Sequence, residues 1–588
     1  MAIANADVAA VFDEIAELLE VQGGNAFRIR AYRNAARTVG ELPRSVADMV
    51  AAGEDLDALP GIGRDLADKI AEIVATGSCA QLESLRKLLP PGVRELLHLP
   101  GLGPKRVQQL HEALGVGDLQ SLREAAQAGR VGALRGFSAQ SERRILEAVQ
   151  ARLATERRFR LDAAAQVAEA LLAELRAMPG VDEAQAAGSL RRARETVGDL
   201  DLLVTARTGS NVTAAFAQLA QVKTVLSRGP TRASVVLGSG MQVDLRVVRP
   251  ASLGAAWLYF TGSKAHNIAL RSLAQERGLK LNEYGLWRGA RRIAGATEAQ
   301  VYEALALPWI DPVLRENRGE IEAARDGALP VLVERAHLRG DLHVHTDASD
   351  GRDPLRAMAE AARERGHRYI AITDHSQRIG LVHGLDAGRL ARQIDAIDEL
   401  NARLSGITVL KGVEVDILED GRLALPDAVL SRLDLVVGAV HERFELPRER
   451  QTARLLKAMD HPHFSILAHP SGRLLGERPG CELDMERVVR HARERGCFLE
   501  LNVHPARLDL DDLACRMARD AGVLVSIATD AHSAAELDHL HWGVGQARRG
   551  WLRPGDVLNT RKLGELLPLL ARSMGRSAGR AARLPEAA

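Results

Sequence analysis

Apolar side chains recur at helical spacing through the first quarter of the chain. From about residue 5 to residue 155 they stand three or four positions apart, short Gly-rich turns interrupt them, and runs of β-branched residues are rare. This period is typical of amphipathic helices that bury one face. We therefore expect an all-helical region, with a first domain at residues 1–88 and a second at residues 89–156.

The pattern changes to that of strands near residue 160. The runs DLDLLVTA (199–206) and SVVLGSGMQVDLRVV (234–248) are rich in the β-branched and apolar residues that strands favour. We expect a mixed α/β domain at residues 157–250 and a smaller α/β domain at residues 251–326. A connecting segment follows at residues 327–338.

Beyond residue 340, short apolar runs alternate with helical stretches, and each run ends in His, Asp or Glu. Examples are RYIAITDH, ITVLKGVEVD, LDLVVGAVH and VLVSIATDAH. Strands that alternate with helices build parallel barrels, which carry their active sites at the C-terminal ends of the strands. We expect such a barrel at residues 339–575 and a disordered tail at residues 576–588. The predicted fold class is therefore multidomain, with α+β and α/β parts.

Composition argues against membrane and disulfide-rich proteins. No apolar run reaches the roughly 18 to 20 residues of a membrane span, and the N-terminus carries acids where a secretory signal carries Lys or Arg. The four Cys are scattered without Cys-x-x-Cys spacing, which disfavours a disulfide framework and a thiolate zinc site. We expect a cytoplasmic protein with no membrane partner, and we expect a monomer.

Charge and histidine content indicate where the functional groups of the chain lie. The net charge is only +1, so any case for a nucleic-acid partner must come from local features. Of the 18 His, only His98, His111 and His266 precede residue 337. Because His binds metals and transfers protons, this skew predicts metal or acid/base chemistry in the C-terminal domain.

Two copies of a Pro-Gly-x-Gly turn in the helical region predict contacts with phosphate. Gly61 and Gly63 belong to the first copy, and Gly101 and Gly103 to the second. Glycine permits a tight turn, and the helix that follows begins with free N–H groups that bind phosphate. One copy alone is equally well explained as a tight helix–helix turn. The repeat favours helix-hairpin-helix elements that grip a DNA backbone without reading its sequence.

Three carboxylates in the first α/β domain predict a divalent-cation site, and donors upstream of them predict a polyphosphate site. Asp199 and Asp201 lie two apart in a strand, so both leave the same face, and Asp244 stands in what should be a neighbouring strand. An all-oxygen site of this kind suits Mg²⁺ or Mn²⁺. Upstream, Ser189 and the pair Arg191 and Arg192 offer donors for a polyphosphate. An acidic strand end would explain two Asp but not this whole constellation.

The segment GSLRRARETVGDLD (188–201) resembles the nucleotidyltransferase signature of family X DNA polymerases. The resemblance continues in YFTGSKAHNIALR (259–271). It implies that the metals bind Asp199, Asp201 and Asp244, the last of which helps to activate the primer 3′-hydroxyl. Nucleotide contacts would come from the small domain and the signature segment: Ser189, Arg192, Tyr259, Phe260, Gly262, Asn267 and Arg271. The partners would be dNTPs and gapped or nicked double-stranded DNA.

The same resemblance aligns Lys69 with a lysine that acts as a Schiff-base nucleophile on abasic sugar 5′-phosphates. Two neighbouring positions at which family members carry Lys hold Arg28 and Asp65 here. This departure leaves the lyase reaction open. Gln242 likewise stands where some members carry an Arg beside the metal site.

Nine metal-ligand candidates lie at strand ends of the predicted barrel. They are His343, His345, Asp350, His375, Glu414, His441, His469, Asp530 and His532. A lone His at a strand end is usually a satisfied polar residue, but so many at strand ends favour a multinuclear site. Mixed imidazole and carboxylate ligands suit Zn²⁺, Mn²⁺ or Fe²⁺. Lys411, Arg473 and Arg507 are further candidates for phosphate contacts.

The order of these motifs resembles the polymerase-and-histidinol-phosphatase (PHP) family. The resemblance implies a distorted (β/α)₇ barrel, a centre of three ions and an active hydrolase. The whole chain then resembles a repair polymerase that fills gaps and trims 3′ ends as a 3′-5′ exonuclease, with abasic-site and 3′-phosphate cleavage as further reactions. The alternative is a phosphoesterase of small phosphates whose N-terminal half is an inactive DNA tether. A DNA-binding scaffold without catalysis would leave two metal sites unexplained.

Overall fold

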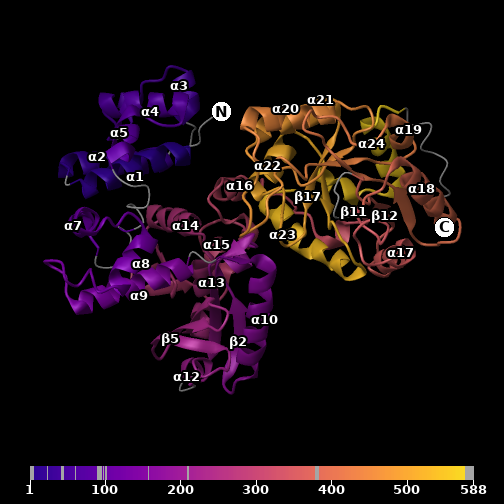
Figure 1. The fold of residues 1–588 in the computed structure, drawn as a ribbon. Coiled ribbons are helices and arrows are strands. Elements are labelled where there is room, and N and C mark those ends of the chain that lie inside the picture. The colour runs from indigo at the N-terminus through magenta and orange to yellow at the C-terminus, as the bar shows by residue number, and fades with distance from the viewer. Residues whose placement is uncertain are drawn as a thin grey trace. The chain divides into compact units, whose positions relative to one another are not determined.

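The structure is a computed structural model in which the chain divides into two units near residue 157 (Figure 1). It describes residues 5–22, 24–41, 46–59, 61–88, 96, 99, 102–155, 158–207, 211–377 and 383–576. Gly101 and most of the predicted tail, from residue 577 onward, lie outside the described residues. In the described part, the helices are all too short or too polar to cross a membrane.

The N-terminal unit is helical wherever it is described, as its sequence pattern predicts. Its helices are α1 (Asn5–Val21), α2 (Ala26–Glu41), α3 (Val46–Ala51), α4 (Arg64–Thr76), α5 (Ala80–Leu88), α7 (Pro104–Leu114), α8 (Leu119–Gln127) and α9 (Ala139–Thr155), with a 3₁₀ turn at Leu56–Ala58. Two separate apolar cores hold it together. One is built from α1 to α5, and the other from the helices that follow residue 96.

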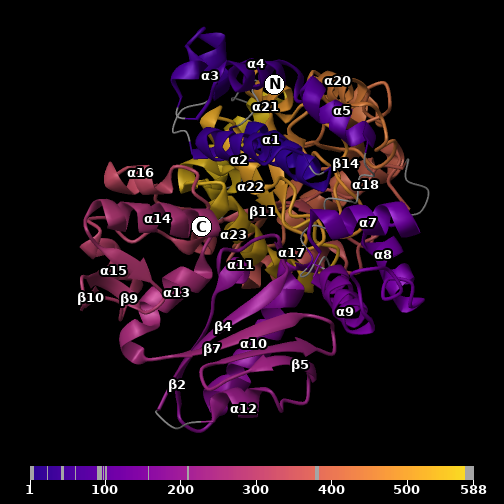
Figure 2. The same cartoon turned by 90° about the vertical axis from the view of Figure 1, so that its left-hand side faces the viewer.

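The C-terminal unit begins with a five-stranded sheet in the order β2-β4-β7-β6-β5. The strands are β2 (Val181–Ala186), β4 (Asp199–Ala206), β5 (Val222–Arg228), β6 (Arg232–Leu237) and β7 (Gln242–Val248). Strands β4 and β7 run parallel, and the other neighbours are antiparallel (Figure 2). Helix α10 (Leu161–Ala177) packs its apolar face on the sheet. Short elements complete this palm-like domain: β1 (Phe159–Arg160), α11 (Gly188–Arg191), β3 (Thr196–Val197) and α12 (Val212–Phe216).

A smaller α/β domain follows, with a three-stranded antiparallel sheet and helices around one core. Its strands are β8 (Lys280–Asn282), β9 (Gly285–Arg288) and β10 (Arg291–Ala294). Its helices are α13 (Leu253–Thr261), α14 (Lys264–Glu276), α15 (Glu298–Ala304) and α16 (Glu320–Arg325), with 3₁₀ turns at Pro250–Ser252, Pro312–Leu314 and Arg335–His337. Trp551, from the barrel, packs into the same core.

A buried carboxylate joins the palm-like domain to the small domain. Glu298, at the start of α15, accepts two hydrogen bonds from Arg191 at 2.7 and 2.8 Å and two from Arg315 at 2.7 and 3.0 Å. Arg315 is fully buried. Burial alone would raise the pKa of Glu298, but hydrogen bonds from the two guanidinium groups outweigh it and lower that pKa to about 2. The carboxylate is therefore ionised, and it fixes α11 against the small domain.

The rest of the chain folds into a parallel barrel. Its strands are β11 (Gly340–Val344), β12 (Tyr369–Ile372), β13 (Thr408–Lys411), β14 (Glu414–Asp416), β15 (Val437–Ala439), β16 (Ile466–Leu467), β17 (Phe498–Asn502) and β18 (Val525–Ala528). Bridges from His375 to Glu414 and from Val344 to Ala531 join the two strand groups and close the ring. Because only two residues separate β13 from β14, the two count as one interrupted strand, and the described ring has seven.

Helices cover the outside of the barrel (Figure 1). They are α17 (Leu355–Glu364), α18 (Ala387–Asn401), α19 (Asp427–Leu430), α20 (Arg448–Met459), α21 (Met485–Arg495), α22 (Asp512–Asp520), α23 (Leu540–Arg549) and α24 (Leu563–Ser573), with 3₁₀ turns at Ala534–His539, Pro554–Asp556 and Leu558–Thr560. Leu566 and Leu570 of α24 join a separate apolar cluster with Leu342, Tyr369 and Phe498 of the strands. The fold class that the sequence predicts is confirmed.

The shared carboxylate of Glu298 generates a stability prediction. Replacing it in Glu298→Gln leaves the buried guanidinium of Arg315 and the partly buried guanidinium of Arg191 without a counter-charge, which costs about 3 to 5 kcal/mol. We expect that loss in the opening free energy of the α13 and α15 amides, measured by hydrogen exchange. The matched control is Glu303→Gln, because Glu303 is exposed on the same helix. Equal protection in the two variants would contradict the assignment.

Candidate active sites

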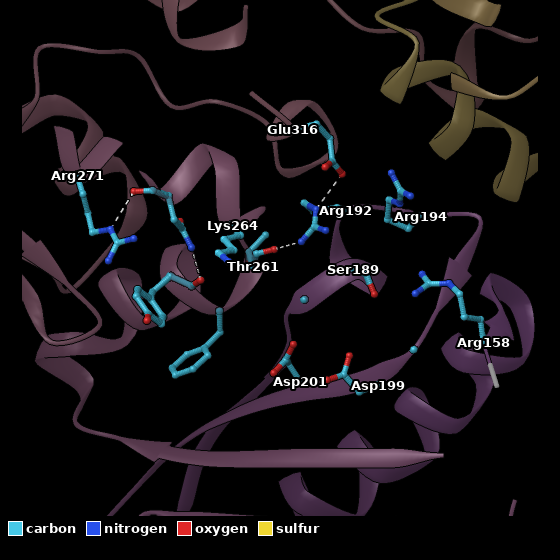
Figure 3. Close-up of a pocket in the computed structure, with 16 residues that line it drawn as sticks. Arg158, Ser189, Arg192, Arg194, Asp199, Asp201, Thr261, Lys264, Arg271 and Glu316 are labelled. Carbon is cyan, nitrogen blue, oxygen red and sulfur yellow. Dashed lines mark hydrogen bonds and ion pairs between the residues drawn. The ribbon is translucent and has the colours of Figure 1, made fainter. Parts of the chain in front are cut away.

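The three predicted carboxylates meet on one face of the palm-like sheet. Asp201 of β4 is in register with Asp244 of β7, and Asp199 is two residues away on β4. The intervening Leu200 is buried on the other side. Figure 3 shows Asp199 and Asp201 side by side below Ser189. The arrangement predicted from the i, i+2 spacing is thus present.

Burial and neighbouring charge raise the pKa of two of these carboxylates, Asp199 and Asp201. Burial and the charge of Asp244 raise the pKa of Asp199. Burial and the charges of Asp199 and Asp244 raise the pKa of Asp201 to about 7. Asp244 is held by two donors, the Ser234 hydroxyl and the Gln242 side-chain amide, the second at 2.9 Å. Oxygen ligands that repel one another in this way fit divalent cations, whose charge removes the repulsion.

Gly188 explains how α11 approaches the carboxylates so closely. Its φ is +63°, and a Cβ at this position would clash with the carboxylate of Asp201. Only glycine meets both conditions without strain. The next residue, Ser189, is thereby placed directly beside Asp199 and Asp201.

A cavity of about 610 Å³ opens beside Asp199 and Asp201. It is lined by all the residues that the sequence assigns to nucleotide binding: Ser189, Arg192, Tyr259, Phe260, Gly262, Asn267 and Arg271. Two hydrogen bonds order its far side, because Asn267 donates to the Tyr259 carbonyl at 2.6 Å and Arg271 donates to the Asn267 carbonyl at 3.3 Å. Arg158, Arg194, Lys264 and Glu316 also line it (Figure 3).

The sequence did not assign those four residues. Arg194 and Lys264 lie inside the quoted motifs, so proximity to the motif was an available signal. No signal in the sequence marked Glu316, because it reaches the cavity from a segment outside both motifs. Arg191 is a correction: it does not line the cavity, since its guanidinium binds Glu298 and stacks on Trp257, 3.4 Å from the ring centre.

All nine barrel candidates converge at the C-terminal ends of the strands. Eight fall into three overlapping groups whose ligand atoms lie within 4.8 Å of one another: His345, Asp350, His375 and His532; His343, His345, Glu414 and Asp530; His375, Glu414 and His441. The ninth, His469, places Nε2 3.0 Å from Glu414. Each group offers the mixed nitrogen and oxygen donors of a divalent-cation site.

Several ring and carboxylate atoms at this centre are buried without a hydrogen-bond partner. They are His343 Nε2, His345 Nδ1 and Nε2, His375 Nδ1, Glu414 Oε2 and His469 Nδ1. Buried polar atoms are rarely left unsatisfied in proteins. Metal ions would satisfy most of these atoms, so the residues present fit a multinuclear centre. His469 and Asp530 also adopt positive φ values of 26° and 54°, a strain that often accompanies ligand clamps.

Two acids that the sequence did not assign contact candidate ligands. Glu500, inside β17, lies 2.7 Å from His343 Nδ1, and Asp416 lies 2.9 Å from His441 Nδ1. Burial raises the pKa of Glu500 to about 7, although His343 lowers it. Metal-binding imidazoles usually use their second nitrogen in this way. Glu500 lies inside β17, and Asp416 ends the run in which Glu414 was assigned as the candidate ligand, so neither acid was singled out.

A cavity of about 310 Å³ leads to this centre. Of the three phosphate-contact candidates, Arg507 lines it together with Arg478, which the sequence did not assign, and Phe444. The other two are corrections. Lys411 is paired with Asp398 at 2.9 Å, and Arg473 is paired with Glu195 of the palm-like domain at 2.7 Å, so neither lines the cavity.

The predicted backbone-binding turns form helix N-termini. Gly61 has a φ of +76°, and Gly63 and Gly103 stand directly before α4 and α7 with no side-chain cap. Lys69 Nζ lies 2.5 Å from Asp65 on the same helix. Partial burial lowers the pKa of Lys69, but the hydrogen bond to Asp65 outweighs it, and the pKa is raised. The amine is therefore held protonated.

Family models match four parts of the chain. A helix-hairpin-helix domain matches residues 3–79, a SAM-like helix-hairpin-helix tandem residues 93–151, a DNA polymerase beta thumb residues 256–316, and a PHP domain residues 341–504. These matches agree with the two centres described above. They do not by themselves cover the carboxylate face of the palm-like sheet.

Of three similar proteins, one matches nearly the whole chain and two match a smaller part of it. The DNA polymerase/3′-5′ exonuclease PolX of Bacillus subtilis (strain 168) is 38% identical over 96% of this chain and 99% of its own length. A probable phosphatase of Thermoanaerobacter sp. (strain X514) is 28% identical over 40% of this chain and 96% of its own length. A probable phosphatase of Acetivibrio thermocellus is 32% identical over 34% of this chain and 80% of its own length. The chain therefore belongs to the PolX family of DNA polymerase/3′-5′ exonucleases.

Proposed function

We propose that this protein is a DNA repair polymerase that fills short gaps and carries a separate 3′-5′ exonuclease centre in its barrel. The observation that carries the proposal is the presence in one chain of two groups of candidate metal ligands, three carboxylates on the palm-like sheet and nine residues at the barrel rim, each beside its own cavity. We assign palm, thumb-like and PHP domains to residues 157–250, 251–326 and 339–575, with a linker at 327–338. Residues 1–88 and 89–156 are the two DNA-binding domains.

In the polymerase centre, Asp199, Asp201 and Asp244 would hold Mg²⁺ or Mn²⁺. Such ions stabilise the charge of the attacking and leaving oxygens in phosphoryl transfer. The chain's own residues orient the reactants. Ser189 and Arg192 hold the triphosphate of the dNTP, and Asp244, fixed by Ser234 and Gln242, faces the primer 3′-hydroxyl. Tyr259, Phe260 and Gly262 contact the sugar, and Asn267 and Arg271 lie near the base and template.

In the barrel, the nine candidate ligands would hold three ions of Mn²⁺, Zn²⁺ or Fe²⁺. When bound, such ions would supply hydroxide at neutral pH and charge that polarises a phosphoester. Glu500 and Asp416 orient His343 and His441, and Arg478 and Arg507 bind the phosphate of the 3′ end. The same geometry accepts a 3′-phosphate or an abasic site, because Arg478 and Arg507 bind the phosphate by charge and the rest of the substrate is not held in this way.

The N-terminal unit binds the backbone of gapped or nicked DNA through its two turns. Free N–H groups at the starts of α4 and α7 attract phosphate, and the exposed Gly63 and Gly103 leave room for the strand. We propose that the protein acts as a monomer. The probable phosphatases named above match the barrel alone, so a phosphoesterase of small phosphates is the second candidate function.

Paired substitutions test the two centres. On a labelled primer across a short gap with Mn²⁺, Asp199→Ala/Asp201→Ala should lower extension about a hundredfold to a thousandfold and leave 3′ degradation intact. His343→Ala/His345→Ala should do the reverse. Extension is measured with dNTPs, and degradation without them.

The outcome separates the candidates. If one pair of substitutions abolishes both reactions, the centres are not independent. If the wild type hydrolyses a small phosphate ester but neither extends nor degrades DNA, the repair function is wrong and the second candidate stands.

The raised pKa of Asp201 predicts proton release on metal binding. Below about pH 7 this carboxyl carries a proton that a cation must displace, whereas above that pH it is already ionised. Mn²⁺ binding to the His343→Ala/His345→Ala variant should release about one proton at pH 6 and almost none at pH 8.5. Calorimetry in buffers of different ionisation enthalpy measures this release. Asp201→Asn is the control, and equal release at both pH values would contradict the assignment.

The Lys69–Asp65 pair predicts weak lyase chemistry. A Schiff base needs a neutral amine, and the ion pair keeps Lys69 protonated. We expect little borohydride trapping on a 5′-deoxyribose phosphate, and an increase of about two- to fivefold in Asp65→Ala. Asp68→Ala, on the same helix, is the control. Trapping that persists in Lys69→Ala would assign the reaction to another residue.

A further inference from the structure

A buried arginine of the barrel contacts two residues that line the cavity beside Asp199 and Asp201. Arg549, the last residue of α23, is 3% exposed. Its Nη1 donates to the backbone carbonyl of Arg192 at 2.8 Å and to Oε1 of Glu316 at 2.9 Å. Its Nη2 binds Asp512, which Arg318 also binds at 3.0 Å. The guanidinium is therefore fixed at both ends.

Glu316 is the residue through which this contact reaches the cavity. The same oxygen, Oε1, also accepts a hydrogen bond from Nε of Arg192 at 3.0 Å. Both Glu316 and Arg192 line the cavity, and Figure 3 shows the pair joined above Ser189. One carboxylate oxygen thus serves two guanidinium groups, one that faces the cavity and one that belongs to the barrel.

This arrangement bears on how a polyphosphate is bound. Glu316 is an anion in the wall of a cavity proposed to receive an anion, and it holds the guanidinium that should bind that anion. With Arg192 alone, the pair would carry no net charge. With Arg549 included, the cluster also contains its partner Asp512 and the Arg318 bound to Asp512, so three guanidinium groups face two carboxylates and one positive charge remains. Burial raises the pKa of Glu316, but Arg192 and Arg549 outweigh it, so the group is ionised.

We propose that Arg549 is a positioning residue of the polymerase reaction, supplied by the exonuclease domain. It neutralises Glu316, keeps the cavity positive and leaves Arg192 able to turn toward the triphosphate of the dNTP. Arg549 is too buried to touch the nucleotide itself, so it acts through Glu316 and the backbone of Arg192. The inference rests on the proposed assignment of Arg192 to the triphosphate.

The plain alternative is that Arg549 only fastens the barrel to the palm-like domain. Its neighbour Arg548 provides a matched comparison, because it makes a similar cross-domain ion pair with Asp311 at 2.5 Å and donates to the Val333 carbonyl at 3.2 Å. Arg548 does not line the cavity. A purely structural role should make the two arginines equivalent.

The test measures single-nucleotide gap filling by the full-length protein. Extension is assayed in the His343→Ala/His345→Ala background, so that degradation does not interfere, and exonuclease activity is assayed with the barrel ligands intact. We expect Arg549→Met to raise the KM for dNTP about five- to tenfold, with kcat and exonuclease activity within about twofold. Arg548→Met should leave the KM unchanged, and Arg549→Lys, which keeps the charge, should restore most of the affinity.

A second substitution at Glu316 distinguishes charge from packing. With the anion removed, Arg549→Met/Glu316→Gln should return the KM to within about twofold of Glu316→Gln alone. Glu316→Gln by itself should lower the KM or leave it unchanged, and this single variant tests the idea even if Arg549→Met does not fold. Equal effects of Arg549→Met and Arg548→Met, or a failure of Glu316→Gln to rescue, would overturn the inference. A wild type that does not extend primers would instead overturn the proposed function.

Discussion

Burial of ionisable groups at strand ends is the constraint on which the C-terminal unit depends. Asp199, Asp201 and Asp244 share one face of a sheet, and the imidazoles of the barrel crowd around Glu414 and Asp530. No apolar packing compensates for such groups, because each loses its water on burial. Cations restore the balance, and the fold must therefore hold the ligands rigidly enough to keep them together before any ion binds. The sheet register and the closed strand ring do so.

The sequence predicted these groups because strand geometry is periodic. The i, i+2 spacing of Asp199 and Asp201, and of His343 and His345, required only that each segment be a strand. The order of polar strand ends predicted the barrel and its rim for the same reason. What spacing could not show is pairing across the chain. Arg191 and Glu298 are 107 residues apart, and nothing near Arg191 indicates that it leaves the cavity to bind an internal acid.

The unpredicted residues share a physical character. Glu500, Asp416, Glu298 and Glu316 are acids that contact a functional side chain rather than the reacting groups. Their local sequence is that of ordinary helix, strand or loop segments, so periodicity gave no signal. Their roles follow only from three-dimensional neighbours, whereas the ligands themselves are marked by position along a strand. The prediction that Lys411 and Arg473 contact phosphate was wrong for a different reason. Both side chains have suitable charge, but each is paired with an acid away from the cavity.

The use of arginine at the buried junctions has a specific consequence. Apolar side chains would hold the palm-like domain, the small domain and the barrel together at least as firmly, because a buried ion pair adds little net stability. A guanidinium differs in that its planar fork fixes direction as well as distance. Arg191 and Arg315 bind both oxygens of Glu298, and Arg549 binds a carboxylate and a carbonyl at once. These junctions therefore set the orientation of α11, which carries Ser189 into the cavity and is followed directly by Arg192, more strictly than packing would.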